Sequence, residues 1–150
     1  MHYYNIILTD LINRHHLQAQ YHTQPHHTQR GVVYVATIFV NDLTARGEDY
    51  DRGKAQEKAA HDAIGRLETQ GFRRRHFKTD LNNIAKKYRL LVRYENSYEG
   101  TPDRRTHKST VTINGTPEGS LGIASREIFA EELAAKTVVE SLEARGYRLR

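Results

Sequence analysis

The sequence predicts an α+β fold in which one unit, with the order helix, three strands and helix, is built twice. The main observation is an internal repeat: residues 57–72 (EKAAHDAIGRLETQGF) align with residues 132–147 (ELAAKTVVESLEARGY) at an offset of 75. A second observation is that residues 8–21 align without gaps with residues 81–94 at an offset of 73. About two residues are therefore inserted between these segments in the second copy.

The repeat divides the chain into two small units, since 150 residues suit one domain of typical size or two very small ones. We expect the first unit over residues 1–72 and the second over 77–150. Residues 73–76 (RRRH) form a basic linker between them.

Each unit begins with a helical pattern of apolar residues. The residues at this spacing are Leu8, Leu11, Ile12 and Leu17 in the first copy and Leu81, Ile84, Ala85 and Tyr88 in the second. A polar loop with Pro follows in each copy. Residues 32–40 (VVYVATIFV) are β-branched and aromatic, as a strand requires, and residues 106–113 are their weaker counterpart.

Turn signals and a second helical pattern complete each unit. The tripeptides VND and ING end the predicted strands, and a short third strand fits residues 45–50 and 119–124. The closing helix has one stripe of small and apolar residues, which would let it lie close to a sheet. Asp51 suits the N-cap of this helix in the first copy.

Composition excludes several classes of function. The chain has no Cys, which excludes disulfides and thiolate metal sites and favours a reducing, intracellular compartment, cytoplasmic or nuclear. No apolar run is long enough to span a membrane, and the first residues lack the pattern of a signal peptide. The histidines show no metal-ligand spacing, and no catalytic motif is present. We expect a protein that is not an enzyme and has no cofactor or metal.

This order of elements, with these residues, resembles the double-stranded-RNA-binding domain, in two copies of which the second is degenerate. The segment LNNIAKKYRLLVRY matches the first helix of that family, and ENSYEGTPDRRTHKSTVTING matches its loop and hairpin. AQEKAAHDAI and AEELAAKTVV hold the small-residue core of its last helix. The resemblance covers nearly the whole chain and implies two three-stranded antiparallel sheets, each packed by two helices.

The resemblance implies binding of duplex RNA by shape, through the first helix, a loop that enters the minor groove, and cations at the start of the last helix. In the first copy the residues at these places are Thr9, Asp10, Asn13 and Arg14 on the helix and His26, His27 and Arg30 in the loop. At the last helix Arg52 matches the family's first Lys in charge, Gly53 and Gln56 replace its second and third Lys, and Lys54 is an extra cation that substitutes in part. We also expect the linker residues Arg73, Arg74 and Arg75 to contact RNA. Solvated, ordinary charges are the simpler alternative for Arg52 and Lys54.

The second copy lacks the phosphate-binding cations. The family's lysine positions are Glu127, Ile128 and Glu131, and Asp103 and Asn83 replace the loop His and the helix acid. Residues 1–72 nevertheless have a net charge of −1 and residues 73–150 a net charge of +6. Cations such as Lys86, Lys87, Arg89, Arg104 and Arg105 either hold phosphates in a different pose or serve solubility.

Two further functions stay open from the sequence. An uncharged third strand in the second copy, with Leu121 and Ile123, predicts a surface for dimerisation or for docking an RNA-processing protein. A catalytic domain outside this chain is a weaker alternative. The expected partners are double-stranded RNA and either a second copy or another protein, and no membrane.

Overall fold

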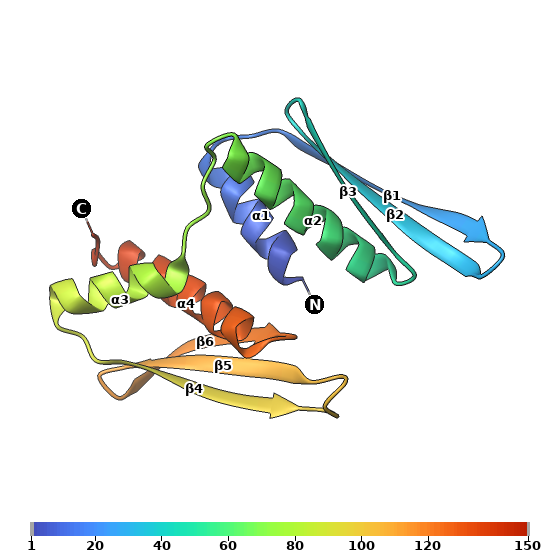
Figure 1. Cartoon of the computed structure of the whole chain (residues 1–150). Coiled ribbons are helices and arrows are strands. Elements are labelled where there is room, and N and C mark those ends of the chain that lie inside the picture. Colours follow the sequence, from blue (N-terminus) through green and yellow to red (C-terminus); the bar gives the residue numbers. More distant parts are fainter. Residues whose placement is uncertain (1, 150) are drawn as a thin grey trace. The chain divides into compact units, whose positions relative to one another are not determined.

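The computed structural model describes residues 2–149 and divides the chain into two compact units, Met1–Arg74 and Arg75–Arg150. Each unit has a helix, three strands and a closing helix, in that order (Figure 1). Both sheets are antiparallel, with strand orders β1-β2-β3 and β4-β5-β6. The predicted fold class, α+β with two double-stranded-RNA-binding-domain-like units, is confirmed.

The elements of unit 1 are α1 (Tyr3–Arg14), β1 (Ala19–Thr28), β2 (Gly31–Val40), β3 (Leu43–Asp49) and α2 (Arg52–Thr69). Those of unit 2 are α3 (Phe77–Tyr88), β4 (Val92–Glu99), β5 (Thr106–Ile113), β6 (Thr116–Ala124) and α4 (Glu127–Ala144). The third strand of each unit begins earlier than predicted. Leu17 lies beyond the end of α1, where its N–H donates to the Ile12 carbonyl at 2.9 Å.

The helices of each unit cover one face of its sheet, so buried and exposed positions alternate along β3, along β6 and at the end of β2. In β2, for example, Ile38 and Val40 are buried while Phe39 is exposed. The small-residue stripe lets α2 approach β3 closely, because a Cβ on Gly47 would overlap backbone atoms of Ala55 and Ala59. Unit 2 repeats this contact at Gly122.

The glutamates shared by the two copies hold the first helix of each unit. In unit 1, Glu57 accepts hydrogen bonds from the N–H groups of Tyr4 at 2.9 Å and Asn5 at 3.0 Å, near the start of α1. In unit 2, Glu132 accepts from the N–H groups of Phe77 and Lys78 in the same way. Such N–H groups have no partner within their own helix. The repeated Glu therefore provides the cap that α1 and α3 lack.

An asparagine makes the same turn in both units. Asn41 and Asn114 adopt left-handed backbone conformations, with φ of 51° and 52°. The Oδ1 of Asn41 accepts from the N–H of Gln18 at 3.1 Å, and that of Asn114 accepts from the N–H of Leu91 at 2.8 Å. Each Asn thus fixes the segment between the first helix and first strand against the second hairpin.

The repeated Gly and aromatic residue end the closing helices. Gly71 and Gly146 have φ of 96° and 94°, which favours glycine. The next residue turns back, and the N–H of Phe72 donates to the Leu67 carbonyl at 3.0 Å. Its ring meets His15 edge-on at 5.4 Å, so the end of α2 is fixed to the end of α1.

The two extra residues of the second copy lie within β6. Thr112 pairs with Pro117 while Thr110 pairs with Leu121, so the register shifts between these pairs. Gly119 lies in the shifted segment with a φ of 65°. This bulge explains why the offset between the copies changes from 73 to 75 within the third strand.

Candidate nucleic-acid interface

The start of α2 presents two exposed cations. Asp51 is the N-cap predicted from the sequence, and its side chain accepts a hydrogen bond from the N–H of Lys54 at 2.9 Å. The side chains of Arg52 and Lys54 are exposed, and neither has a carboxylate within 4.0 Å among the described residues. Because a helix N-terminus carries partial positive charge, this end of α2 can bind an anion.

An ion pair borders these cations. The Nζ of Lys58 lies 2.8 Å from the carboxylate of Asp49. Hydrogen bonds from Lys58 and from the N–H of Asp51 hold the pKa of Asp49 below its usual range. Asp49 is thus kept ionised and is paired with Lys58. Arg52 and Lys54 therefore remain exposed to solvent.

The predicted minor-groove loop of unit 1 is a tight turn, and two residues assigned to it lie elsewhere. His26 and His27 belong to β1, where they pair with Val33 and Val32 of β2. The β-branched residues of β2 extend the ladder to Thr28, so Gln29 and Arg30 alone form the turn. Arg30 is exposed at its tip.

The β1–β2 hairpin extends beyond β3 at the end of the sheet where α2 begins. The last residue of β3, Asp49, pairs with Tyr34, while β1 and β2 continue to the pair of Thr28 with Gly31. Figure 1 shows this hairpin projecting past β3. His26, His27 and Arg30 therefore lie on a projecting arm at the same end of unit 1 as Arg52.

Most of the α1 side chains that we expect to contact RNA also make contacts within unit 1. The hydroxyl of Thr9 donates to the Asn5 carbonyl at 2.8 Å. Asp10 pairs with Arg14 at 3.6 Å, and Arg14 donates to the Arg73 carbonyl at 2.6 Å. Asn13, in contrast, is exposed. Arg14 thus lies beside one oxygen of the Asp10 carboxylate, which keeps further acceptor sites.

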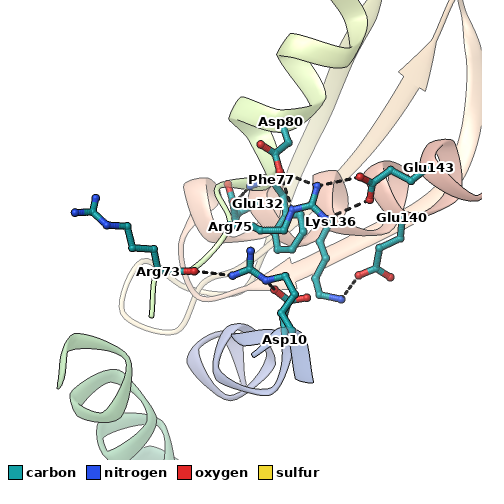
Figure 2. A network of polar contacts seen from close by, with 10 residues as sticks. Asp10, Arg73, Arg75, Phe77, Asp80, Glu132, Lys136, Glu140 and Glu143 are labelled. Carbon is teal, nitrogen blue, oxygen red and sulfur yellow. Dashed lines mark hydrogen bonds and ion pairs between the residues drawn. The ribbon is translucent and has the colours of Figure 1, made fainter. Parts of the chain in front are cut away.

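The three linker arginines differ in their surroundings. Arg75 lies in unit 2, between Asp80 at 2.8 Å and Glu143 at 3.2 Å, and Figure 2 shows its guanidinium between these carboxylates. Arg74 is half-buried, with Glu68 at 4.0 Å. Arg73 is exposed. Arg75 thus joins the two helices of unit 2, and Arg73 is the most exposed of the three predicted RNA contacts in the linker.

The corresponding surface of unit 2 is acidic and closed. At the start of α4, the carboxylates of Glu127 and Glu131 both accept from the side-chain amide of Asn96, at 3.0 and 2.8 Å. Glu131 also pairs with Lys78 at 2.6 Å. Burial, followed by the charges of Glu131 and Glu132, raises the pKa of Tyr94 to about 12. These side chains bind one another, and their net charge would repel phosphate.

A cavity beside β1 includes residues that the sequence analysis did not single out. It has a volume of about 300 Å³, and Tyr21 and Gln56 contribute to its lining. Gln56, at the family's third lysine position, donates to the hydroxyl of Thr23 at 3.1 Å. Burial raises the pKa of Tyr21. The equivalent place in unit 2 has Lys78 and Tyr94 in the lining. The duplication itself was the available signal, since Tyr21 aligns with Tyr94.

Other classes of site find no support in the described residues. No three His, Asp or Glu side chains among residues 2–149 form a group that could hold a metal ion. No helix in this part of the chain is both long and apolar enough to cross a bilayer.

Comparisons with known proteins return one kind of match. No protein-family model matches the sequence, and no curated protein matches it. Among solved structures, the chain is similar to the solution structure of both dsRBDs of DRB4 along with their linker. The identity is 22%, the match covers 96% of this chain and 98% of that chain, and the TM-score is 0.45.

Proposed function

We propose that this chain binds double-stranded RNA by shape and through phosphate and 2′-hydroxyl contacts, without catalysing a reaction. Unit 1 provides the main contact surface, and Arg73 of the linker adds a cation. The observation that carries the proposal is the exposed pair Arg52 and Lys54 at the N-terminus of α2, together with the arm formed by the β1–β2 hairpin at the same end of the unit.

This arrangement suits a duplex because it separates two kinds of contact. The arm continues for three residue pairs beyond the last pair of β3, or roughly 10 Å at the usual strand rise. Its tip carries Arg30, and its strands carry His26 and His27. A reader of A-form RNA has to touch a minor groove and the neighbouring phosphates at once. In the proposed complex the arm enters the groove while Arg52 and Lys54 bind phosphates.

The test is the affinity of the full chain for an RNA duplex of about 20 base pairs, compared with the same DNA duplex. We expect a preference for RNA with little sequence dependence, and an affinity that falls steeply between about 50 and 200 mM salt. The change of Arg52 and Lys54 to Ala should weaken binding to all RNA duplexes equally. It should also reduce the slope of affinity against salt by about two.

A matched control removes two other exposed cations of unit 1, Arg46 and Arg66. Each already pairs with a carboxylate, Arg46 with Glu48 at 2.5 Å and Arg66 with Asp62 at 3.0 Å. Their change to Ala should leave RNA affinity nearly unchanged. Equal losses in both double variants would contradict a specific phosphate site at α2.

As a second function, we propose that unit 2 binds a second copy or an RNA-processing protein through β6. Leu121 and Ile123 are 53% and 42% exposed on the sheet face away from α4. In unit 1 the corresponding positions, fixed by pairing with Thr37 and Thr110, are Arg46 and Glu48. β6 lies at the edge of its sheet, so the residues after the bulge at Gly119 can pair with another strand.

Light scattering of the full chain tests self-association. We expect a dimer at high micromolar concentration that dissociates when Leu121 becomes Arg and Ile123 becomes Glu, which copies the unit 1 residues. A wild-type chain that stays monomeric at that concentration excludes the homodimer. A dimer that survives both changes would have its contact elsewhere.

A further inference from the structure

Unit 2 carries more positive charge than unit 1, but this charge does not lie at the start of α4. Residues 75–150 have a net charge of +4, against +1 for residues 1–74. The start of α4 is nevertheless acidic. The excess cations must therefore lie on another part of unit 2, and their location indicates what they bind.

Four cations come together where α3 and α4 end. We call this surface the α3-end patch, and its members are Lys86, Lys87, Arg89 and Arg148. The Nζ of Lys87 donates to the Arg148 carbonyl at 2.6 Å, and the hydroxyl of Tyr88 donates to the same carbonyl at 2.8 Å. The Tyr88 and Tyr147 rings meet edge-on at 5.0 Å. These contacts place the segment after α4 against the last turn of α3.

The α3-end patch is not neutralised within the described chain. All four side chains are exposed, and none has a carboxylate within 4.0 Å among residues 2–149. Five other described cations of unit 2 pair with acids, Arg75 among them, whereas Arg93, Arg104, Arg105 and Arg126 do not. Lys78 pairs with Glu131, Lys108 with Glu99, Lys136 with Glu140, and Arg145 with Glu118. The acids of unit 2 thus pair with other cations, and the charged side chains of this patch are all positive.

Unit 1 shows which part of the patch is needed for folding. Its Arg14 donates to the Arg73 carbonyl at 2.6 Å, as Lys87 does to Arg148. The repeat aligns Asn13 with Lys86 and His16 with Arg89, and Asp10 pairs with Arg14. One cation therefore suffices to hold the two helix ends together. Lys86 and Arg89 are additions that this contact does not require.

The patch lies at the opposite end of unit 2 from the start of α4. The first residues of α3 bind Glu132 in the second turn of α4, whereas Tyr88 at its end binds the segment that follows α4. The two helices therefore run in the same direction. Phosphate bound at the α3-end patch would be far from Glu127 and Glu131, whose charges repel it.

From this charge and placement we propose that the α3-end patch is a second phosphate-binding surface for RNA, on a face of unit 2 that does not include the start of α4. It rests on the proposed RNA-binding function and extends it. The ligand is the phosphodiester backbone, whose negative charges complement the exposed ammonium and guanidinium groups of the patch. The patch contributes affinity that depends on salt but not on sequence.

The test changes Lys86 and Arg89 to Gln in the full chain, leaving Lys87 and Arg148 to hold the helix ends. We expect affinity for the RNA duplex to fall on the order of tenfold near 100 mM salt, with a loss of about two in the salt slope. The control changes Lys108 and Arg126 to Gln, which removes the same charge from positions elsewhere in unit 2. It should bind RNA almost as the wild type does.

Each outcome separates this inference from the proposed function. A normal salt slope in the Lys86 and Arg89 variant overturns the patch alone, as does an equal loss in the control. A wild-type chain that binds no duplex RNA at low salt overturns both. Leu91 and Leu149 are exposed near the patch, so an acidic peptide with leucines is the competing occupant. Its binding through Lys86 and Arg89, without an effect of these residues on RNA, would assign the patch to a protein.

Discussion

Units 1 and 2 differ in what they present at the start of the closing helix and agree in what holds that helix in place. Arg52 and Lys54 stand exposed at α2, whereas Glu127 and Glu131 are held by Asn96 at α4. Identity between the copies is concentrated where a contact recurs. The repeated Glu caps the first helix and the repeated Gly ends the last one. The comparison teaches that residues kept in both copies serve packing, and that residues that differ on the surface are the candidates for function.

The interiors of the two units differ as well. Ser109 and Ser120 of unit 2 are 0% and 1% exposed, and neither hydroxyl has a hydrogen-bond partner among residues 2–149. The repeat aligns them with Ala36 and Ala45 of unit 1, which are equally buried. A buried hydroxyl without a partner costs free energy. Unit 2 therefore carries a destabilising feature that its own duplicate lacks.

The largest expected effect comes from the contact that both units share most closely. The changes Gly47→Ala and Gly122→Ala should each lower the free energy of unfolding of their own unit by more than about 3 kcal/mol, because the added Cβ overlaps helix backbone. Hydrogen exchange followed by mass spectrometry reports each unit separately. Gly65→Ala is the control, since nothing lies within 4 Å of the added Cβ, and it should stabilise α2 by about 0.5–1 kcal/mol.

Removal of the shared cap should have the next largest effect. Glu57→Ala leaves the N–H groups of Tyr4 and Asn5 without their acceptor and should destabilise unit 1 by about 2 kcal/mol. Exchange protection of unit 2 should stay the same. Glu48→Ala, which removes only an exposed ion pair with Arg46, should cost less than about 0.5 kcal/mol. Similar losses for both changes would show that the cap has no special role.

Exchange of the buried serines should make the units more alike. Ser109→Ala and Ser120→Ala should each stabilise unit 2 by about 1 kcal/mol, and Ala36→Ser should destabilise unit 1 by a similar amount. Urea denaturation followed by exchange in each unit measures this. A loss of stability in the alanine variants would mean that these hydroxyls are hydrogen-bonded in solution.

The smallest effect concerns the carboxylate that closes the α4 surface. Burial favours a higher pKa for Glu131, but hydrogen bonds from Lys78 and Asn96 outweigh it and hold this pKa below its usual range. A lowered pKa gives stability that is complete above the unfolded-state value, about 4.3, and is lost as the pH falls through the folded-state value. Unit 2 should thus lose up to about 1 kcal/mol more than its Glu131→Gln variant on acidification. Parallel acid profiles would contradict the assignment.

The sequence predicted the fold because the repeat states each element twice. A weak strand such as residues 106–113 gained support from its stronger copy, and the N-cap at Asp51 was apparent from local chemistry. The minor-groove loop was predicted wrongly at His26 and His27. Strand pairing with Val32 and Val33 decided their position, and composition favours a loop in a polar segment with Pro25.

Site residues were harder to predict because exposure depends on neighbours that are distant in sequence. Arg75 belongs to a run of basic residues, yet it forms ion pairs with Glu143 and Asp80. Arg52 and Lys54 stay exposed because Lys58 pairs with the nearby acid Asp49. The carboxylate of Asp51 is taken up by the N–H of Lys54. Nothing in the sequence gives those distances. The patch at the end of α3 required the fold, because Arg148 is far along the chain from Lys86.

The cap on the first helix also sets the order in which each unit can form. Glu57 lies 53 residues after Tyr4. During synthesis α1 must wait for α2 to emerge before its N-terminus is capped, so folding of unit 1 requires closure of nearly its whole length. The helix α4 is synthesised later, and it carries Glu132, which has the same chemistry at the same place in its helix. Duplication thus provides a second glutamate with the same chemistry, and exchange of helices between the copies is avoided when unit 1 folds before Glu132 emerges.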